Sequence, residues 1–214
     1  MLQQVGESYV AMPVHYMSAQ WPLLVTAHQD RFIHIWDLRK VVTGNFDPID
    51  LIESPLKYAT TSLTVFGDGK GFVVGSIEGR CSVNNYDFDK SDKGKKDDFC
   101  FKCHRTEDQN KKQGECFTVN GFAFNRQYNT LVSLGSDGHF YTWNKDLKSK
   151  YKSSKKFPSP MTAGDFSHDG SLMAYAVGYD WSMGAEAQKQ RKYETLFYVR
   201  TPDIATEVYK PGQK

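Results

Sequence analysis

The chain has 214 residues, of which 39% are hydrophobic and 14% aromatic, and its formal net charge is +2. This composition excludes a disordered polymer and fits one domain with a sizeable core, while so small a net charge does not by itself argue for nucleic-acid binding. No apolar run approaches the ~20 residues of a membrane span and the N-terminus has no secretory signal, so we expect a cytosolic or nuclear chain with reduced cysteines.

A short motif occurs four times: an apolar strand followed by a turn that carries an acidic residue. The copies are LLVTAHQD at 23–30, FVVGSIE at 72–78, LVSLGSD at 131–137 and MAYAVGYD at 173–180. Their turn acids are Asp30, Glu78, Asp137 and Asp180, spaced by 48, 59 and 43 residues. Such a period, with a Trp-Asp pair at Trp36-Asp37, is typical of the blades of a WD-type β-propeller.

Further strands are predicted on both sides of these copies. The preceding strands are expected at 61–65, 119–124 and 161–166, and the following ones at 31–37, 80–86, 139–143 and 194–200. The Gly, Asp and Asn residues between them suit tight hairpins. We therefore predict an all-β, WD40-type β-propeller in a single domain spanning 1–214, with four blades at about 5–53, 57–104, 116–157 and 158–205.

The polar segments between these strands are interpreted as loops. They lie at 87–98, 105–115, 145–156 and 182–192. No helix longer than a turn or two is required by the pattern.

The turn acids and the tryptophans that follow them have structural explanations. An Asp at a tight turn accepts hydrogen bonds from backbone N–H groups. A Trp six residues later, as Trp36 follows Asp30 and Trp143 follows Asp137, can bury its ring between neighbouring blades. The predicted structural blade residues are Asp30, Trp36, Asp37, Glu78, Asp137 and Asp180.

The segment CFKCH at 100–104 matches the C-x-x-C-H attachment signature of c-type haem. Haem attachment needs an exported chain, and the sequence shows no export signal. Zinc bound by Cys100, Cys103, His104 and Cys116 is conceivable, but adjacent residues point to opposite sides of a strand. We favour a blade strand with buried thiols and predict no metal and no cofactor.

No nucleophile-elbow, Walker or H-E-x-x-H motif occurs, so we predict no catalytic residues and no enzyme.

The lysine-rich segment KDLKSKYKSSKK at 145–156 follows directly on Trp143 and has six lysines against one acid, Asp146. An aromatic ring beside a row of ammonium groups suits single-stranded nucleic acid, because a stacked base contributes roughly 1–3 kcal/mol and the lysines neutralise phosphates. The alternative is a solvated loop with Trp143 buried as a wedge. The residues alone favour this alternative.

Several phrases together resemble one known family. They are IESPLKYATTS (52–62), GSIEGRCS (75–82), FKCHR (101–105), VNGFAF (119–124), LGSDGHFYTWNKD (134–146) and YAVGYDWSMG (175–184). This combination resembles the nuclear-pore mRNA-export WD-repeat β-propellers, whose sibling is the spindle-checkpoint propeller. Asp180-Trp181 favours the export branch, and a kinetochore checkpoint adaptor of the same fold is the alternative.

The resemblance implies a non-enzymatic adaptor at the nuclear pore and nuclear envelope, in the nucleus and also the cytoplasm, that acts in mRNA export. Such proteins bind a peptide segment of an FG-repeat nucleoporin and single-stranded RNA. Matched by motif, Arg80 is expected at the nucleoporin peptide. The residues expected in the RNA groove are Phe101, Trp143, Lys145, Lys148 and Lys150, with Trp143 exposed for stacking. Asn144 departs from the Asp usual after this Trp.

The resemblance also implies seven blades, of which this chain has about four. Met1 aligns where a mid-propeller strand begins, so the chain looks like the C-terminal portion of such a propeller. We therefore expect a further chain or a preceding segment to complete it.

Overall fold

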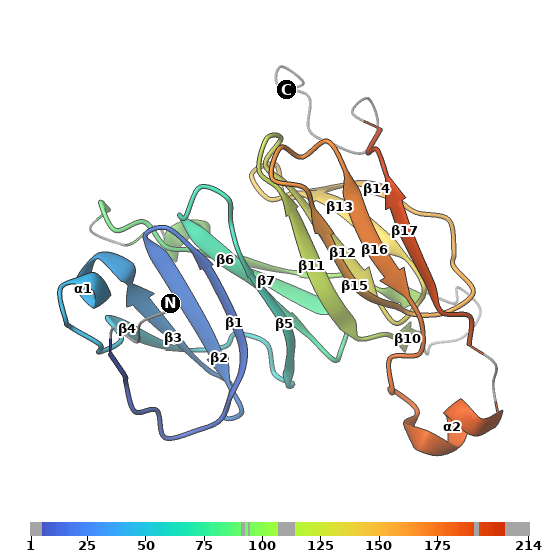
Figure 1. Ribbon diagram of the computed structural model, residues 1–214, viewed down its shortest axis with the longest axis horizontal. Helices are drawn as coiled ribbons and strands as arrows, with labels where there is room; N and C mark the ends of the chain where they lie inside the picture. Colours follow the sequence, from blue (N-terminus) through green and yellow to red (C-terminus); the bar gives the residue numbers. More distant parts are fainter. Residues whose placement is uncertain (1–5, 91–92, 94, 107–113, 191–192, 204–214) are drawn as a thin grey trace, which may run out of the picture.

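The computed structural model describes residues 6–90, 93, 95–106, 114–190 and 193–203, and these form an all-β protein (Figure 1). Four antiparallel sheets follow one another along the chain, and within each sheet the strands lie side by side in chain order. The predicted fold class is therefore confirmed. The blade boundaries and the blade number of the whole protein stay predictions, and Met1 lies outside the described residues.

The first and second sheets have four strands each. The first consists of β1 (Val14–Gln20), β2 (Leu23–His28), β3 (Phe32–Asp37) and β4 (Asp50–Glu53). The second consists of β5 (Thr60–Val65), β6 (Gly71–Ser76), β7 (Arg80–Asn85) and β8 (Phe99–Lys102).

The third sheet also has four strands, and the fourth has three among the described residues. The third consists of β11 (Val119–Asn125), β12 (Thr130–Gly135), β13 (Phe140–Asn144) and β14 (Ser149–Ser153). The fourth consists of β15 (Met161–Phe166), β16 (Met173–Val177) and β17 (Leu196–Arg200).

Shorter elements connect these sheets. They are the helix α1 (Leu38–Val42), a 3-10 turn (Lys95–Asp97), the hairpin of β9 (Arg105–Thr106) and β10 (Glu115–Cys116), and the helix α2 (Gly184–Gln190). In Figure 1, α2 lies apart from the sheets at the bottom of the picture, below β10. No helix in the described ranges is long and apolar enough to cross a membrane.

Each pair of consecutive sheets encloses its own hydrophobic core. One cluster joins the first sheet to the second, another the second to the third, and a last one the third to the fourth. The central strands β6 and β12 are buried at every position, because each is covered by a sheet on either side. This is why their sequences, GFVVGS and TLVSLG, contain only glycine, apolar residues and small hydroxyl residues, without the alternation of a half-exposed strand.

The first strands of the four sheets lie next to each other. β1 contacts β5, β5 contacts β11, and β11 contacts β15. Sheets that meet along their first strands and pack face to face are the arrangement of propeller blades around an axis. The structure is therefore consistent with a β-propeller.

The repeated acid turns share one backbone conformation. The carboxylates of Asp30, Asp137 and Asp180 each accept a hydrogen bond from the backbone N–H two residues later, at 3.1, 3.1 and 3.2 Å. The residue directly after each turn acid has a positive φ, of 71° at Arg31, 62° at Gly79, 75° at Gly138 and 62° at Trp181. Only two of these four are glycines, so Arg31 and Trp181 are held by their surroundings in a conformation that L-residues disfavour.

The other predicted structural residues of the first sheet also bond locally. Trp36 is 6% exposed and donates from Nε1 to Thr26 Oγ1 at 3.1 Å. Asp37 begins α1 by accepting from the Arg39 backbone N–H at 3.0 Å, and it also pairs with the Arg39 guanidinium.

Two of the predicted loops are wrong. The segment 145–156 contains β14, which pairs with β13 as the outer strand of the third sheet. The segment 182–192 contains α2. Their polar composition misled the prediction because an outer strand or a surface helix is solvated on one side and carries no continuous apolar run. The expected loops at 87–98 and 105–115 extend outside the described residues.

Gly75 in β6 tests the close packing of the second sheet on the third. A Cβ at this position would lie against Ser62 Oγ and 2.7 Å from Val119 Cγ1. We expect Gly75→Ala to lower the free energy of unfolding by about 1–3 kcal/mol through overpacking, measured by urea unfolding.

Gly121→Ala is the matched control, because a Cβ there would meet only Leu134 Cδ1, at an ordinary 3.5 Å. It should change the free energy of unfolding by less than about 1 kcal/mol. Equal effects of the two substitutions would contradict the packing described here.

Candidate nucleic-acid interface

Phe101 and Trp143 meet in a groove between the second and third sheets. Phe101 lies on β8 and Trp143 on β13, and their ring centroids are 4.5 Å apart with the planes inclined by 49°. Both rings are partly buried against the core between these sheets. The structure therefore brings together the two predicted aromatic residues, with Trp143 half-buried rather than fully exposed.

Two further rings extend this pair into a row. Phe99 lies 5.9 Å from Phe101, and Tyr141 lies 6.0 Å from Trp143. Each strand contributes two rings because residues two apart share a face. The sequence prediction missed Phe99 and Tyr141, although the alternation in FCFK and FYTWN could have identified them. We call these four residues the aromatic row.

Lys148 and Lys150 cover the outer rings of this row. Lys148 Nζ is 4.8 Å from the centroid of Phe99, and Lys150 Nζ is 5.3 Å from that of Tyr141. Both lysines are exposed. The groove therefore has ammonium groups beside aromatic faces, as the sequence predicted for these two residues.

Lys145 is placed differently from the other two lysines. Its side chain is only 8% exposed, and Nζ is 2.8 Å from Asp146 and 3.8 Å from Asp68. The same ammonium lies 5.0 Å from the ring centroid of Phe66. Because its charge is already paired, Lys145 stabilises the contact between the second and third sheets beside the groove. It is poorly placed to meet a phosphate.

Asn144 has a structural role that its sequence position did not reveal. The residue is buried, and its Oδ1 accepts hydrogen bonds from the backbone N–H groups of Asp146 and Leu147 at 2.8 and 3.0 Å. Its Nδ2 donates to Tyr151 Oη at 2.7 Å. It shapes the turn between β13 and β14 and so positions the lysines that follow.

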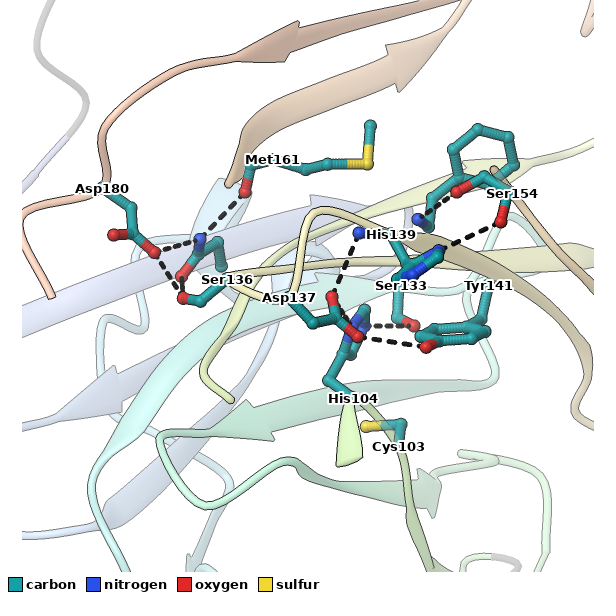
Figure 2. A network of polar contacts seen from close by, with 12 residues as sticks. Cys103, His104, Ser133, Ser136, Asp137, His139, Tyr141, Ser154, Met161 and Asp180 are labelled. Carbon is teal, nitrogen blue, oxygen red and sulfur yellow. Dashed lines mark hydrogen bonds and ion pairs between the residues drawn. The ribbon is translucent and has the colours of Figure 1, made fainter. Parts of the chain in front are cut away.

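A chain of hydrogen bonds fixes the indole of Trp143 from behind. Trp143 Nε1 donates to Ser133 Oγ at 2.9 Å, Ser133 Oγ lies 2.9 Å from His104 Nε2, and His104 Nδ1 lies 2.8 Å from Asp137 Oδ1. Because a carboxylate only accepts, His104 Nδ1 donates to it. Tyr141 Oη donates to the second carboxylate oxygen at 3.0 Å, as Figure 2 shows. This network holds two members of the aromatic row in fixed orientations.

The environment of Asp137 favours its ionised form. Burial acts to raise the pKa of this carboxyl, but the hydrogen bonds from His104, Tyr141 and the His139 backbone outweigh it, and the pKa lies below its ordinary value. Asp180 behaves in the same way, since its bonds to Ser136 and Asn120 offset burial and lower its pKa.

Arg80 lies at the start of β7, in the turn that carries Glu78. Arg105 holds this turn by donating to the carbonyl oxygens of Gly79 and Glu78, at 3.1 and 2.6 Å. Arg80 Nε is buried without a hydrogen-bond partner, and its nearest anion is the Glu78 carboxylate at 3.5 Å. Its side chain is 37% exposed, so part of the guanidinium reaches the surface.

The C-x-x-C-H segment forms no metal centre in the described structure. Cys103 is buried and Cys100 exposed, so the prediction of buried thiols on this strand is confirmed for Cys103 and wrong for Cys100. Cys116 is also exposed. His104 uses both ring nitrogens in the network behind Trp143. Among the described residues, no three His, Cys, Asp or Glu side chains are grouped so that they could hold a metal ion.

The low pKa of Asp137 makes the stability of the third sheet depend on pH. Because the folded pKa is depressed, the contribution of this carboxylate is fully present above the ordinary pKa of Asp and is lost as the pH falls through the folded value. We expect the difference in free energy of unfolding between wild type and Asp137→Asn to be constant near neutral pH and to shrink below about pH 4. Urea unfolding across this range measures it, and a difference that keeps its size down to about pH 2 would contradict the assignment.

Comparison with known proteins identifies relatives of this chain. No protein-family profile matches the sequence. Protein RAE1 of Arabidopsis thaliana is 36% identical over 195 residues, which cover 91% of this chain and 52% of that protein. The mRNA export factor of Macaca fascicularis is 34% identical over 221 residues, covering 100% of this chain and 55% of that protein. The mRNA export factor GLE2 of Chaetomium thermophilum is 37% identical over 171 residues, covering 80% and 45%.

The chain spans about half the length of the curated relatives it matches. The matches cover 80% to 100% of this chain, and the identity is similar in plant, animal and fungal relatives. Over nearly its whole length, this chain is homologous to the mRNA export factor family of RAE1 and GLE2.

Proposed function

We propose that this chain acts in mRNA export as a non-enzymatic adaptor at the nuclear pore. In this proposal it binds single-stranded RNA in the groove of the aromatic row and a peptide segment of an FG-repeat nucleoporin beside Arg80. The names of the relatives support the process. The observation that carries the RNA site is the row of four rings with the exposed ammonium groups of Lys148 and Lys150 at its outer members.

Stacking of a base on these rings is more favourable than the cation–π contact of a lysine with them. A cation over an exposed ring contributes about 0.5–1 kcal/mol, whereas a base stacked on an aromatic side chain contributes about 1–3 kcal/mol. An arriving base therefore displaces the ammonium group from Phe99 or Tyr141. The released lysine remains within reach of the phosphate that accompanies the base, so the two interactions add.

The charge of the groove predicts a salt-dependent affinity. We expect Lys148→Gln combined with Lys150→Gln to weaken binding of a labelled oligouridine RNA in fluorescence anisotropy. The slope of log K against log salt should become shallower by about 1.4, which is about 0.7 for each phosphate contact of a single strand. Lys40→Gln with Lys57→Gln removes the same charge from exposed positions in α1 and in the linker after the first sheet, and should leave the slope unchanged.

The substitution Phe101→Leu tests the contribution of base stacking to RNA binding separately from that of charge. This variant should lose about 1–3 kcal/mol of binding free energy while the salt slope stays as in wild type. Phe197→Leu is the control, since Phe197 lies on β17 and is 71% exposed. Trp143→Ala is unsuitable because it also breaks the bond to Ser133. If both Phe variants bind RNA equally well, the groove is not the RNA site.

A separate groove beside the Glu78 turn supports the peptide site. It has a volume of about 520 Å³, and Ile77 of this turn lines it together with Phe117, Phe157, Met183 and Tyr193. Polar side chains also line this groove, among them Asp137 and Lys156, so it suits an extended peptide that carries both hydrophobic and polar side chains. The part of the Arg80 guanidinium that reaches the surface is the proposed donor to an acceptor group of the peptide, while its Nε faces the Glu78 carboxylate at 3.5 Å.

Arg80→Ala should weaken binding of a synthetic FG-repeat nucleoporin segment by about 1.5–3 kcal/mol, through loss of a hydrogen bond from a charged group. Isothermal titration calorimetry measures the affinity. Arg126→Ala is the control, because Arg126 is exposed in the turn between β11 and β12. An affinity for the peptide that is the same in both variants would remove Arg80 from the site.

A further inference from the structure

Two buried cysteines lie against each other behind the aromatic row. Cys81 Sγ and Cys103 Sγ are 3.3 Å apart, and both residues carry free thiols. Cys81 is 0% exposed and Cys103 is 5% exposed. Neither thiol takes part in the peptide site or in the hydrogen-bond network behind Trp143, and Cys103 lines a small pocket beside Tyr141, Trp143 and Lys150 of the RNA groove.

The backbone keeps the two sulfur atoms together. Cys81 lies on β7 opposite Phe101 of β8, and the Cys103 backbone N–H donates to the Gly79 carbonyl at 3.0 Å, which continues the pairing past the end of β8. Both side chains pack in the core between the second and third sheets. The strand pairing and the shared core therefore keep the two thiols next to each other.

We propose that Cys81 and Cys103 are a site of reversible oxidation, at which hydrogen peroxide converts the thiol pair into an intrachain disulfide. A disulfide needs the sulfur atoms to move closer by a little more than one ångström, to about 2.05 Å. The two cysteines are 22 positions apart in the sequence, so the bond would also reduce the freedom of the unfolded chain.

Peroxide reaches the pair through Cys103. This residue lines a surface pocket of about 160 Å³ together with Lys102, Tyr141 and Lys150, and the pocket is large enough for a molecule of peroxide size. Cys81 has no exposed surface, and burial together with its neighbour Cys103 raises its pKa well above the usual value, so it remains a neutral thiol. Cys103 therefore reacts first and Cys81 second.

The reaction balances as two steps. The sulfur of Cys103 attacks one oxygen of peroxide, the O–O bond breaks, and the products are a sulfenic acid on Cys103 and one water. The sulfur of Cys81 then attacks the sulfenic sulfur, the S–O bond breaks, and the departing hydroxide leaves as a second water with the proton of the Cys81 thiol. The two thiols supply the two electrons that reduce the peroxide, and a dithiol reductant reverses the change.

The test uses the full chain with Cys100→Ser and Cys116→Ser, so that only Cys81 and Cys103 remain. The folded protein is treated with hydrogen peroxide, denatured, and alkylated with N-ethylmaleimide before intact-mass measurement and peptide mapping. We expect the loss of two hydrogen atoms, no alkylation, and a disulfide that joins the peptides of Cys81 and Cys103. Dithiothreitol should restore two alkylatable thiols.

The same chain with Cys103→Ala is the matched control, because it keeps Cys81 without its partner. It should remain fully alkylatable after the same peroxide treatment. Circular dichroism confirms that each variant is folded, and Cys103→Ser replaces Cys103→Ala if the latter unfolds. The proposal is overturned if both thiols of the parent variant are still alkylated after treatment, if only sulfinic acid forms, or if the disulfide joins two molecules.

Discussion

The structure depends on the burial of the central strands of the second and third sheets, each of which lies between two neighbouring sheets. A strand such as β6 or β12 has no solvated face, so its side chains must fit both the sheet before it and the sheet after it. Three separate core clusters result, one at each contact between consecutive sheets. A sheet without its neighbours would expose two apolar faces, which is why the sheets fold as a series rather than as independent units.

The candidate RNA groove is a direct consequence of this stacking. Where the second sheet meets the third, β8 and β13 approach at their outer margins, and their rings fill the space between them. The rings of Phe101 and Trp143 pack against the core between the two sheets, and the exposed part of each ring remains available to a ligand. The groove is therefore built by the same packing that holds the sheets together, and the network from Trp143 to Asp137 gives it a fixed shape without separate binding machinery.

The sequence identified part of this site and misjudged another part. Phe101 and Trp143 meet as the resemblance implied, and alternation along the strands explains why Phe99 and Tyr141 join them. Lys145 was grouped with Lys148 and Lys150 because all three occur in one basic segment. Lys145 differs from them because its ammonium group pairs with Asp68, in the turn between β5 and β6 of the second sheet. A partner so distant in the sequence cannot be predicted from the local pattern.

The repeated turns show where local sequence was sufficient. An acid followed by a strand specifies a tight turn, because the carboxylate satisfies a backbone N–H two residues on. This interaction is local, and the all-β class and most central strands followed from it together with the apolar runs. Even in these turns, Arg31 and Trp181 have a positive φ. The sequence would have indicated this conformation only if glycine stood at these positions.

The sequence by itself thus determined the class of fold, the order of the main strands and the segment in which aromatic and basic residues meet. These features depend on neighbours within one turn or one strand. Only the tertiary structure decided that 145–156 contains an outer strand, that Lys145 is paired, and that Cys81 and Cys103 are in contact. The first depends on the pairing of β14 with β13, the second on the approach of Asp68 from the second sheet, and the third on the pairing of β7 with the chain at the end of β8. None of these contacts is visible in the local sequence pattern.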